Sequence, residues 1–192
     1  MGFFSLAARG CYPGAAIHAY EPNPRILPYL AGNARPLQVR VFNEAVGATH
    51  DRVEILDSGE SNLAAVQKSP AGSVIQVPFS EAVARLGGHV DLLKLDCEGA
   101  EWELFESESD WRRVRDLRME YHLTNGRCFT DVRRAVESLG FAITRHEPDS
   151  RWGILWAANR RFANGSEQPD PGRRGPEPGL GAAGSSIPLR GR

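Results

Sequence analysis

The fold of this chain is decided by residues 90–101, which read Val90-Asp91-Leu92-Leu93-Lys94-Leu95-Asp96-Cys97-Glu98-Gly99-Ala100-Glu101. The stretch begins with a short apolar run, which is typical of a buried strand. Polar and acidic side chains follow at once, and Gly99 permits a tight turn into a helix. Ligands of open α/β sheets bind beyond the carboxyl ends of the strands. Asp96 and Glu98 are therefore candidates to orient a substrate hydroxyl, with Lys94 balancing their charge. The alternative is a helix N-terminus that is rich in acids because the helix dipole favours them.

The segments on either side of this strand alternate between strand and helix patterns. Short strands are expected at 17–20, 39–42, 52–56, 74–77, 117–121, 141–144 and 154–158. Helices are expected after the cap residue Asn23, with Pro24 at the first helical position, over 80–86, and from the cap residue Thr130 to Gly140. This order predicts an α/β fold with a mostly parallel sheet covered by helices and a C-terminal antiparallel hairpin.

The overall composition excludes several classes of protein. The 192 residues carry 23 basic and 24 acidic side chains, a formal net charge of −1, so the basic excess of a nucleic-acid-coating protein is absent. No run approaches eighteen apolar residues, which argues against a membrane-spanning helix. Three cysteines without C-x-x-C spacing indicate neither a disulfide framework nor a zinc knuckle, and they favour a cytoplasmic location.

The composition changes abruptly at residue 163. Seven glycines and five prolines lie among the 30 residues from 163 to 192. Large apolar side chains are almost missing there, so such a segment cannot bury enough surface to offset the entropy of ordering it. We therefore expect a folded domain over 1–162 and a disordered Gly/Pro-rich tail over 163–192.

Two further strands end in an acid. Glu21 follows the strand at 17–20, where a carboxylate can accept hydrogen bonds from both ribose hydroxyls of an adenosine cofactor; a charge that complements the next helix dipole explains it equally well. Glu120 lies near the end of the strand at 117–121, and His122 follows this strand. His122 is a candidate general base because its ordinary pKa lies near neutral pH, and it is equally a candidate for a partly buried structural histidine.

Other chemistries have weaker support. Cys97 follows a strand, but no G-x-S-x-G elbow exists and no base is paired with it, so a small apolar thiol is the better interpretation. The residue types of Asp96, Glu98, Glu120 and His122 would suit a metal, but their spacing defines no metal site. A nucleotide-dependent dehydrogenase would require G-x-G-x-x-G before Glu21, and no such motif is present.

Taken together, several segments resemble the FkbM family of S-adenosylmethionine-dependent methyltransferases. The resemblance covers about residues 1–160 and is carried by these stretches in order: Gly2-Phe3-Phe4-Ser5-Leu6-Ala7-Ala8, Ala19-Tyr20-Glu21-Pro22-Asn23-Pro24, Asn43-Glu44-Ala45-Val46-Gly47, residues 90–101, Met119-Glu120-Tyr121-His122 and Gly140-Phe141. The stretches "EPNP" and "KLDCEGAE" are specific in combination.

The resemblance implies a Rossmann-like methyltransferase fold and transfer of a methyl group to a hydroxyl of a small molecule, sugar or lipid. It places Glu21 at the cofactor ribose and Glu44 and Ala45 near the adenine. Asp96 and Glu98 match the loop that faces the transferred methyl group and the acceptor. Asp96, Glu98 and His122 are the candidates to take the acceptor proton. No metal ligand is assigned, and metal dependence and oligomeric state stay open.

The sequence departs from the family at its beginning. The family has an acid- and glycine-rich loop, D-x-G-A-N-x-G, after its first strand, and Met1 and Gly2 match its last two positions. Gly2 is thus the remaining cofactor-binding residue of that loop. We expect the first strand to be missing and the edges of its neighbours to be unpaired. A longer native protein and a non-catalytic remnant of such an enzyme are both compatible with this expectation.

Overall fold

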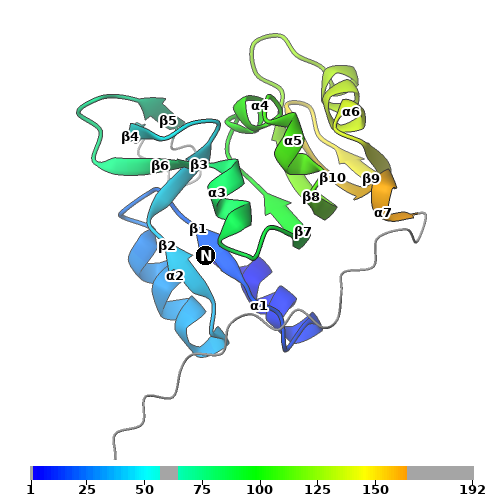
Figure 1. Cartoon of the computed structure of the whole chain (residues 1–192). Helices are drawn as coiled ribbons and strands as arrows, with labels where there is room; N and C mark the ends of the chain where they lie inside the picture. The colour runs from blue at the N-terminus through cyan, green and yellow to red at the C-terminus, as the bar shows by residue number, and fades with distance from the viewer. Residues whose placement is uncertain (1, 57–64, 164–192) are drawn as a thin grey trace, which may run out of the picture.

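The computed structural model describes residues 2–56 and 65–163, so the predicted tail lies outside the described residues, apart from Ala163. Its strands form three separate sheets, which are shown with their helices in Figure 1. No helix in the described part is long and apolar enough to cross a membrane.

The N-terminal part holds two helices and a two-stranded parallel sheet. The elements are α1 (Phe3–Cys11), β1 (His18–Tyr20), α2 (Leu27–Ala34), the 3-10 helix η1 (Arg35–Leu37) and β2 (Arg40–Phe42). The helix predicted to begin at Pro24 begins later, at Leu27, because Asn23 first caps a turn: its Oδ1 accepts the Arg25 N–H at 2.9 Å. Helix α1 was not predicted, and none of its residues is buried.

A second sheet has the order β3-β6-β4-β5 and precedes the apolar strand that begins at Val90. Its elements are β3 (Glu44–Gly47), β4 (Asp51–Leu56), β5 (Ala65–Lys68) and β6 (Val74–Pro78), followed by α3 (Phe79–Ala84). Ala45, Val53 and Val74 form a small core of its own. Strands β4 and β6 were predicted, whereas β3 and β5 were not.

The C-terminal sheet has the order β7-β8-β10-β9 and carries the main core. Its elements are β7 (Val90–Leu95), α4 (Glu101–Leu104), α5 (Glu108–Trp111), β8 (Val114–His122), α6 (Phe129–Ser138), β9 (Phe141–Pro148), β10 (Trp152–Asn159) and α7 (Arg160–Ala163). Leu117, Met119 and Leu155 of the sheet pack with Trp111 of α5 and Val132 of α6 in one buried cluster. The predicted hairpin is confirmed as the antiparallel pair β9 and β10.

Helix α6 begins before the predicted cap Thr130. Cys128 is the N-cap, and the Asp131 carboxylate accepts its backbone N–H at 2.9 Å and its thiol at 3.3 Å. The acid at the third helical position thus binds the N-cap residue, as in a capping box, whereas we had expected a threonine to be the cap.

The expected mostly parallel sheet is not found in that form. Parallel pairing joins β1 to β2, β3 to β6 and β7 to β8, while the remaining strand pairs are antiparallel. Within the described residues, β1 pairs only with β2 and β7 only with β8, so each keeps one open edge. A continuous sheet would require a strand between them.

Candidate functional site

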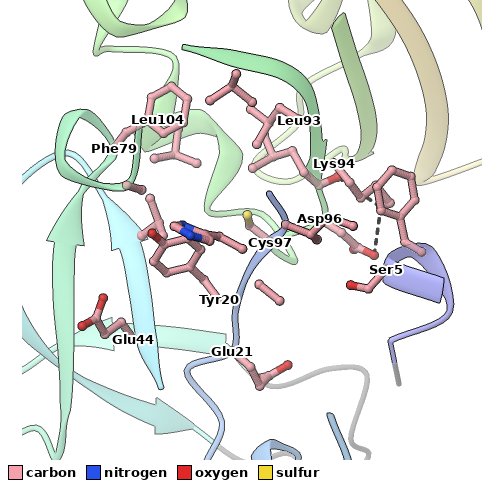
Figure 2. Close-up of a pocket in the computed structure, with 18 of the residues that line it drawn as sticks. Ser5, Tyr20, Glu21, Glu44, Phe79, Leu93, Lys94, Asp96, Cys97 and Leu104 are labelled. Atoms are coloured by element: carbon pink, nitrogen blue, oxygen red, sulfur yellow. Dashed lines mark hydrogen bonds and ion pairs between the residues drawn. The ribbon is translucent and has the colours of Figure 1, made fainter. Parts of the chain in front are cut away.

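One cavity of about 1190 Å³ lies between the separated sheets. It is lined by the start of α1, by β1, by β3 and α3, and by β7 with the turn after it, as Figure 2 shows from within. Small-molecule sites typically measure about 300–1,000 Å³, so a ligand of nucleotide size fits. The predicted site residues that line it are Gly2, Glu21, Glu44, Ala45, Asp96 and Glu98. His122 is not among the lining residues.

Gly2 forms the rim of the cavity at the start of α1. It is the N-cap of this helix and has a φ of 84°, a left-handed conformation that favours glycine. A Cβ at this position would lie 3.3 Å from the Leu30 side chain. The backbone at Gly2 therefore turns close to α2, where any other residue would adopt an unfavourable φ and displace the Leu30 side chain slightly.

Glu21 lies directly after β1 and is held by a short turn. Its Oε1 accepts the backbone N–H of Asn23 at 2.8 Å, and its own N–H donates to the Phe42 carbonyl at 3.0 Å. Asn43 Nδ2 donates to the Glu21 carbonyl at 2.9 Å. Burial raises the pKa of the Glu21 carboxyl, although the Asn23 hydrogen bond opposes this. The carboxylate is thus fixed at the cavity wall, where a ligand hydroxyl would compensate for its lost hydration.

Glu44 is paired within the protein. Its carboxylate receives both ends of the Arg85 guanidinium, with Nη2 to Oε1 at 3.2 Å and a shorter contact from Nη1 to Oε2. The same guanidinium lies 4.8 Å from the centre of the Phe42 ring, which stacks on Tyr20 at 4.8 Å. Glu44 and the buried Ala45 therefore form a firm wall of the cavity, and the Glu44 charge is already compensated.

Asp96 and Glu98 present carboxylates at the end of β7. Lys94 Nζ lies 3.1 Å from Asp96 Oδ2, and the Asp96 side chain is 44 % exposed. Glu98 has a φ of 51° and Gly99 a φ of 101°. The left-handed conformation is unfavourable at Glu98 because it carries a Cβ, so this strained turn must be stabilised by its surroundings. Burial raises the pKa of Glu98, whereas the neighbouring His122 lowers it.

His122 lies behind Glu98 as seen from the cavity. Its Nε2 is 3.2 Å from Glu98 Oε2 and 3.9 Å from Glu120 Oε1. Its Nδ1 is 3.4 Å from Glu101 Oε1, within ion-pair distance but without the geometry of a hydrogen bond. The contact with Glu101 is the largest cause that raises the pKa of His122, and burial opposes it. His122 therefore does not line the cavity but contacts Glu98, which does.

Glu101 was not predicted as a site residue. Its side chain is fully buried at 0 % exposure, and its carboxylate accepts the backbone N–H groups of Gly99 at 2.8 Å and His122 at 2.7 Å. Its place in the sequence, in the first turn of a helix, suggested only a favourable charge at a helix end. The sequence contains no pattern that predicts the hydrogen bond between Glu101 and His122 of β8.

Two expectations about alternative chemistry can be compared with the structure. Desolvation raises the pKa of the Cys97 thiol to about 12, which makes it a poor thiolate nucleophile and agrees with an apolar role. Among the described residues no group of three or more histidine, cysteine or acidic side chains has the arrangement of a metal site.

Comparison with known proteins identifies the domain. A family model described as "Methyltransferase FkbM domain" matches residues 2–143. No curated protein and no solved structure matches the chain. The matched segment includes every residue assigned above to the cavity wall and to the cluster behind it. The chain therefore belongs to the FkbM methyltransferase family.

Proposed function

We propose that this methyltransferase binds S-adenosylmethionine in the cavity and methylates a hydroxyl oxygen of a small molecule, sugar or lipid. The observation that carries the proposal is the convergence of Glu21, Asp96 and Glu98 on one cavity from the ends of β1 and β7. Family membership gives the reaction type. The free cysteines of the described residues are compatible with the reducing cytoplasm that we expect.

The residues present fit the nucleoside half of the cofactor. The Glu21 carboxylate is desolvated at the cavity wall, and two ribose hydroxyls would supply the hydrogen bonds that it lost with water. The wall formed by Glu44, Ala45 and Phe79 would border the adenine. Gly2 would bring backbone close to the amino-acid portion. When bound, S-adenosylmethionine supplies an electrophilic methyl group on a sulfonium.

The chain's own contribution to the transfer is to align the acceptor and take its proton. Alignment of two bound reactants accounts for a large part of the acceleration in such displacements. Asp96 and Glu98 line the cavity and can accept a hydrogen bond from the acceptor hydroxyl. Glu98 is the stronger candidate base, because burial raises its pKa and brings it closer to working pH. His122 supports Glu98 from behind.

The open edges of β1 and β7 border the cavity in which we place the cofactor. We infer that a strand between them completes the sheet in the active protein, because buried strand edges leave backbone groups unpaired. Mass-spectrometric sequencing of the native N-terminus tests this: residues before Met1 with a strand pattern support it, and a native protein that starts at Met1 argues for a non-catalytic remnant.

Calorimetric titration with S-adenosylhomocysteine tests the cofactor site. Glu21→Ala is expected to weaken binding by about 1–3 kcal/mol through lost charged hydrogen bonds. Glu137→Ala, an exposed acid of α6 away from the cavity, serves as the control and should leave the affinity unchanged. Equal affinities of Glu21→Ala and wild type would refute the ribose assignment. If the wild-type chain binds nothing, the remnant interpretation holds for this sequence.

A further inference from the structure

The fully buried Glu101 joins two elements of the proposed active site. A carboxylate with 0 % exposure is costly unless its oxygens are satisfied. Oε2 accepts the Gly99 N–H at 2.8 Å and Oε1 accepts the His122 N–H at 2.7 Å. One side chain thus connects the turn after β7 to the end of β8. Both bonds are charge-assisted, and such bonds are stronger than neutral ones.

The same carboxylate faces the imidazole of His122. Nδ1 lies 3.4 Å from Oε1 of Glu101, while Nε2 on the opposite side of the ring lies 3.2 Å from Oε2 of Glu98. The ring is therefore flanked by two carboxylates, one buried and one at the cavity. A third, Glu120, contacts Nε2 at 3.9 Å.

We propose that Glu101 is a positioning residue, whose buried carboxylate orients the His122 ring so that the ring holds the Glu98 carboxylate toward the cavity. The proposal rests on the proposed function, in which Glu98 faces the methyl acceptor. Glu101 supports both partners of the contact between His122 and Glu98, because it also accepts the N–H of Gly99, which follows the left-handed Glu98. It touches no part of the cavity itself.

The charges around His122 affect the protonation of its ring, which can be measured. The acids that face the ring are Glu98 from the turn, Glu101 from α4 and Glu120 from β8, and Asp96 acts on it through Glu98. Glu98, Glu101 and Glu120 favour the charged imidazolium, and Glu101 is the largest cause of the raised pKa of His122; Asp96 acts against them, because it raises the pKa of Glu98. The charge of Glu101 favours the imidazolium in any orientation of the ring, whereas a neutral tautomer with its hydrogen on Nδ1 requires that the ring turns this nitrogen toward Glu101.

Nitrogen-15 NMR of the imidazole rings of the whole chain tests the proposal without cofactor or acceptor. In the wild type above the His122 midpoint, the neutral ring is expected to carry its hydrogen on Nδ1, facing Glu101. In Glu101→Gln the His122 midpoint should fall by about one pH unit or more, as expected for loss of an adjacent opposite charge. His50, which is paired with Glu81, is the internal control and should not change.

The outcomes separate this proposal from the function on which it rests. A neutral ring protonated on Nε2 in the wild type, or an unchanged midpoint in a folded Glu101→Gln protein, overturns the positioning role. If Glu101→Gln does not fold, the wild-type tautomer still decides. Failure of S-adenosylhomocysteine to bind would count against the proposed function, but it would not alter either NMR result.

Discussion

The buried indole of Trp111 gives a quantitative test of the core that supports the site. Its side chain is completely buried, and its ring packs 5.0 Å from Phe79, 5.9 Å from Phe105 and 6.0 Å from Phe141, measured between ring centres. Nε1 donates to the Leu104 carbonyl at 2.8 Å. Trp111→Ala removes all of these contacts at once, and Trp111→Phe keeps part of the ring stacking.

The expected magnitudes follow from these contacts. Trp111→Ala should lower the free energy of unfolding by about 3–5 kcal/mol for the lost burial and the cavity, plus about 1 kcal/mol for the hydrogen bond. The Leu104 carbonyl also accepts the Ser107 N–H at 3.1 Å, so it keeps one partner. Trp111→Phe should therefore cost only about 1 kcal/mol for the bond and about 1–2 kcal/mol for the smaller ring.

Urea denaturation followed by far-UV circular dichroism measures both variants. With a slope of about 2 kcal/mol per molar urea, Trp111→Phe should lower the midpoint by about 1 M. The control is Trp152→Ala at an exposed tryptophan, which should change stability by only about 0.5 kcal/mol. If Trp111→Ala destabilises no more than Trp152→Ala, the packing of α5 against the sheet described here is wrong.

Three further predictions concern pH, backbone space and the C-terminal segment. The folded pKa of His122 is raised, so its stabilisation is present below pH 6.5 and lost as the pH rises through the folded pKa; His18 and His146 act in the opposite direction. The difference between wild type and His122→Gln in urea titrations should therefore shrink from pH 6 to pH 8, and a constant difference would contradict it. Gly153→Ala places a Cβ 2.8 Å from the Glu147 carbonyl oxygen and against the buried Tyr121, so thermal unfolding should show a loss of about 1–3 kcal/mol, whereas Gly10→Ala, with open space around it, should show none. Deletion of residues 163–192 should leave the melting temperature nearly unchanged, and a large drop would mean that this segment packs on the domain.

Strands were predicted correctly where their own residues form an apolar run or alternate between apolar and polar. The apolar run at 90–96 became β7, and the alternating residues at 52–56 became β4, since burial on one or both faces is written into the sequence. Strand β3 was missed because only Ala45 and Gly47 of its four residues are buried and its partner β6 lies far along the chain. Helix α1 buries no residue, so it had no apolar stripe directed at a core.

Site residues could be predicted where an acidic residue directly follows a predicted strand. Glu21, Asp96 and Glu98 follow β1 and β7, and the topology brings them to one cavity. His122 as a base stays a prediction: its side chain does not line the cavity, but it contacts Glu98, which does. Glu101 was missed because its contacts with His122 connect residues twenty-one apart. No local rule of helix capping includes such a bond.

Completion of the sheet and the proposed cofactor binding both concern the open edges of β1 and β7. Glu21 ends one of these strands and Asp96 follows the other, so the distance across the cavity between the two acids depends on what lies between the strands. A strand there would pair with the free backbone groups on both sides and would fix this distance. Aligned reactants lose much of their rate advantage when groups shift by about 1 Å. In the proposed function, the alignment of these two acids for methyl transfer therefore depends on the closure of the sheet.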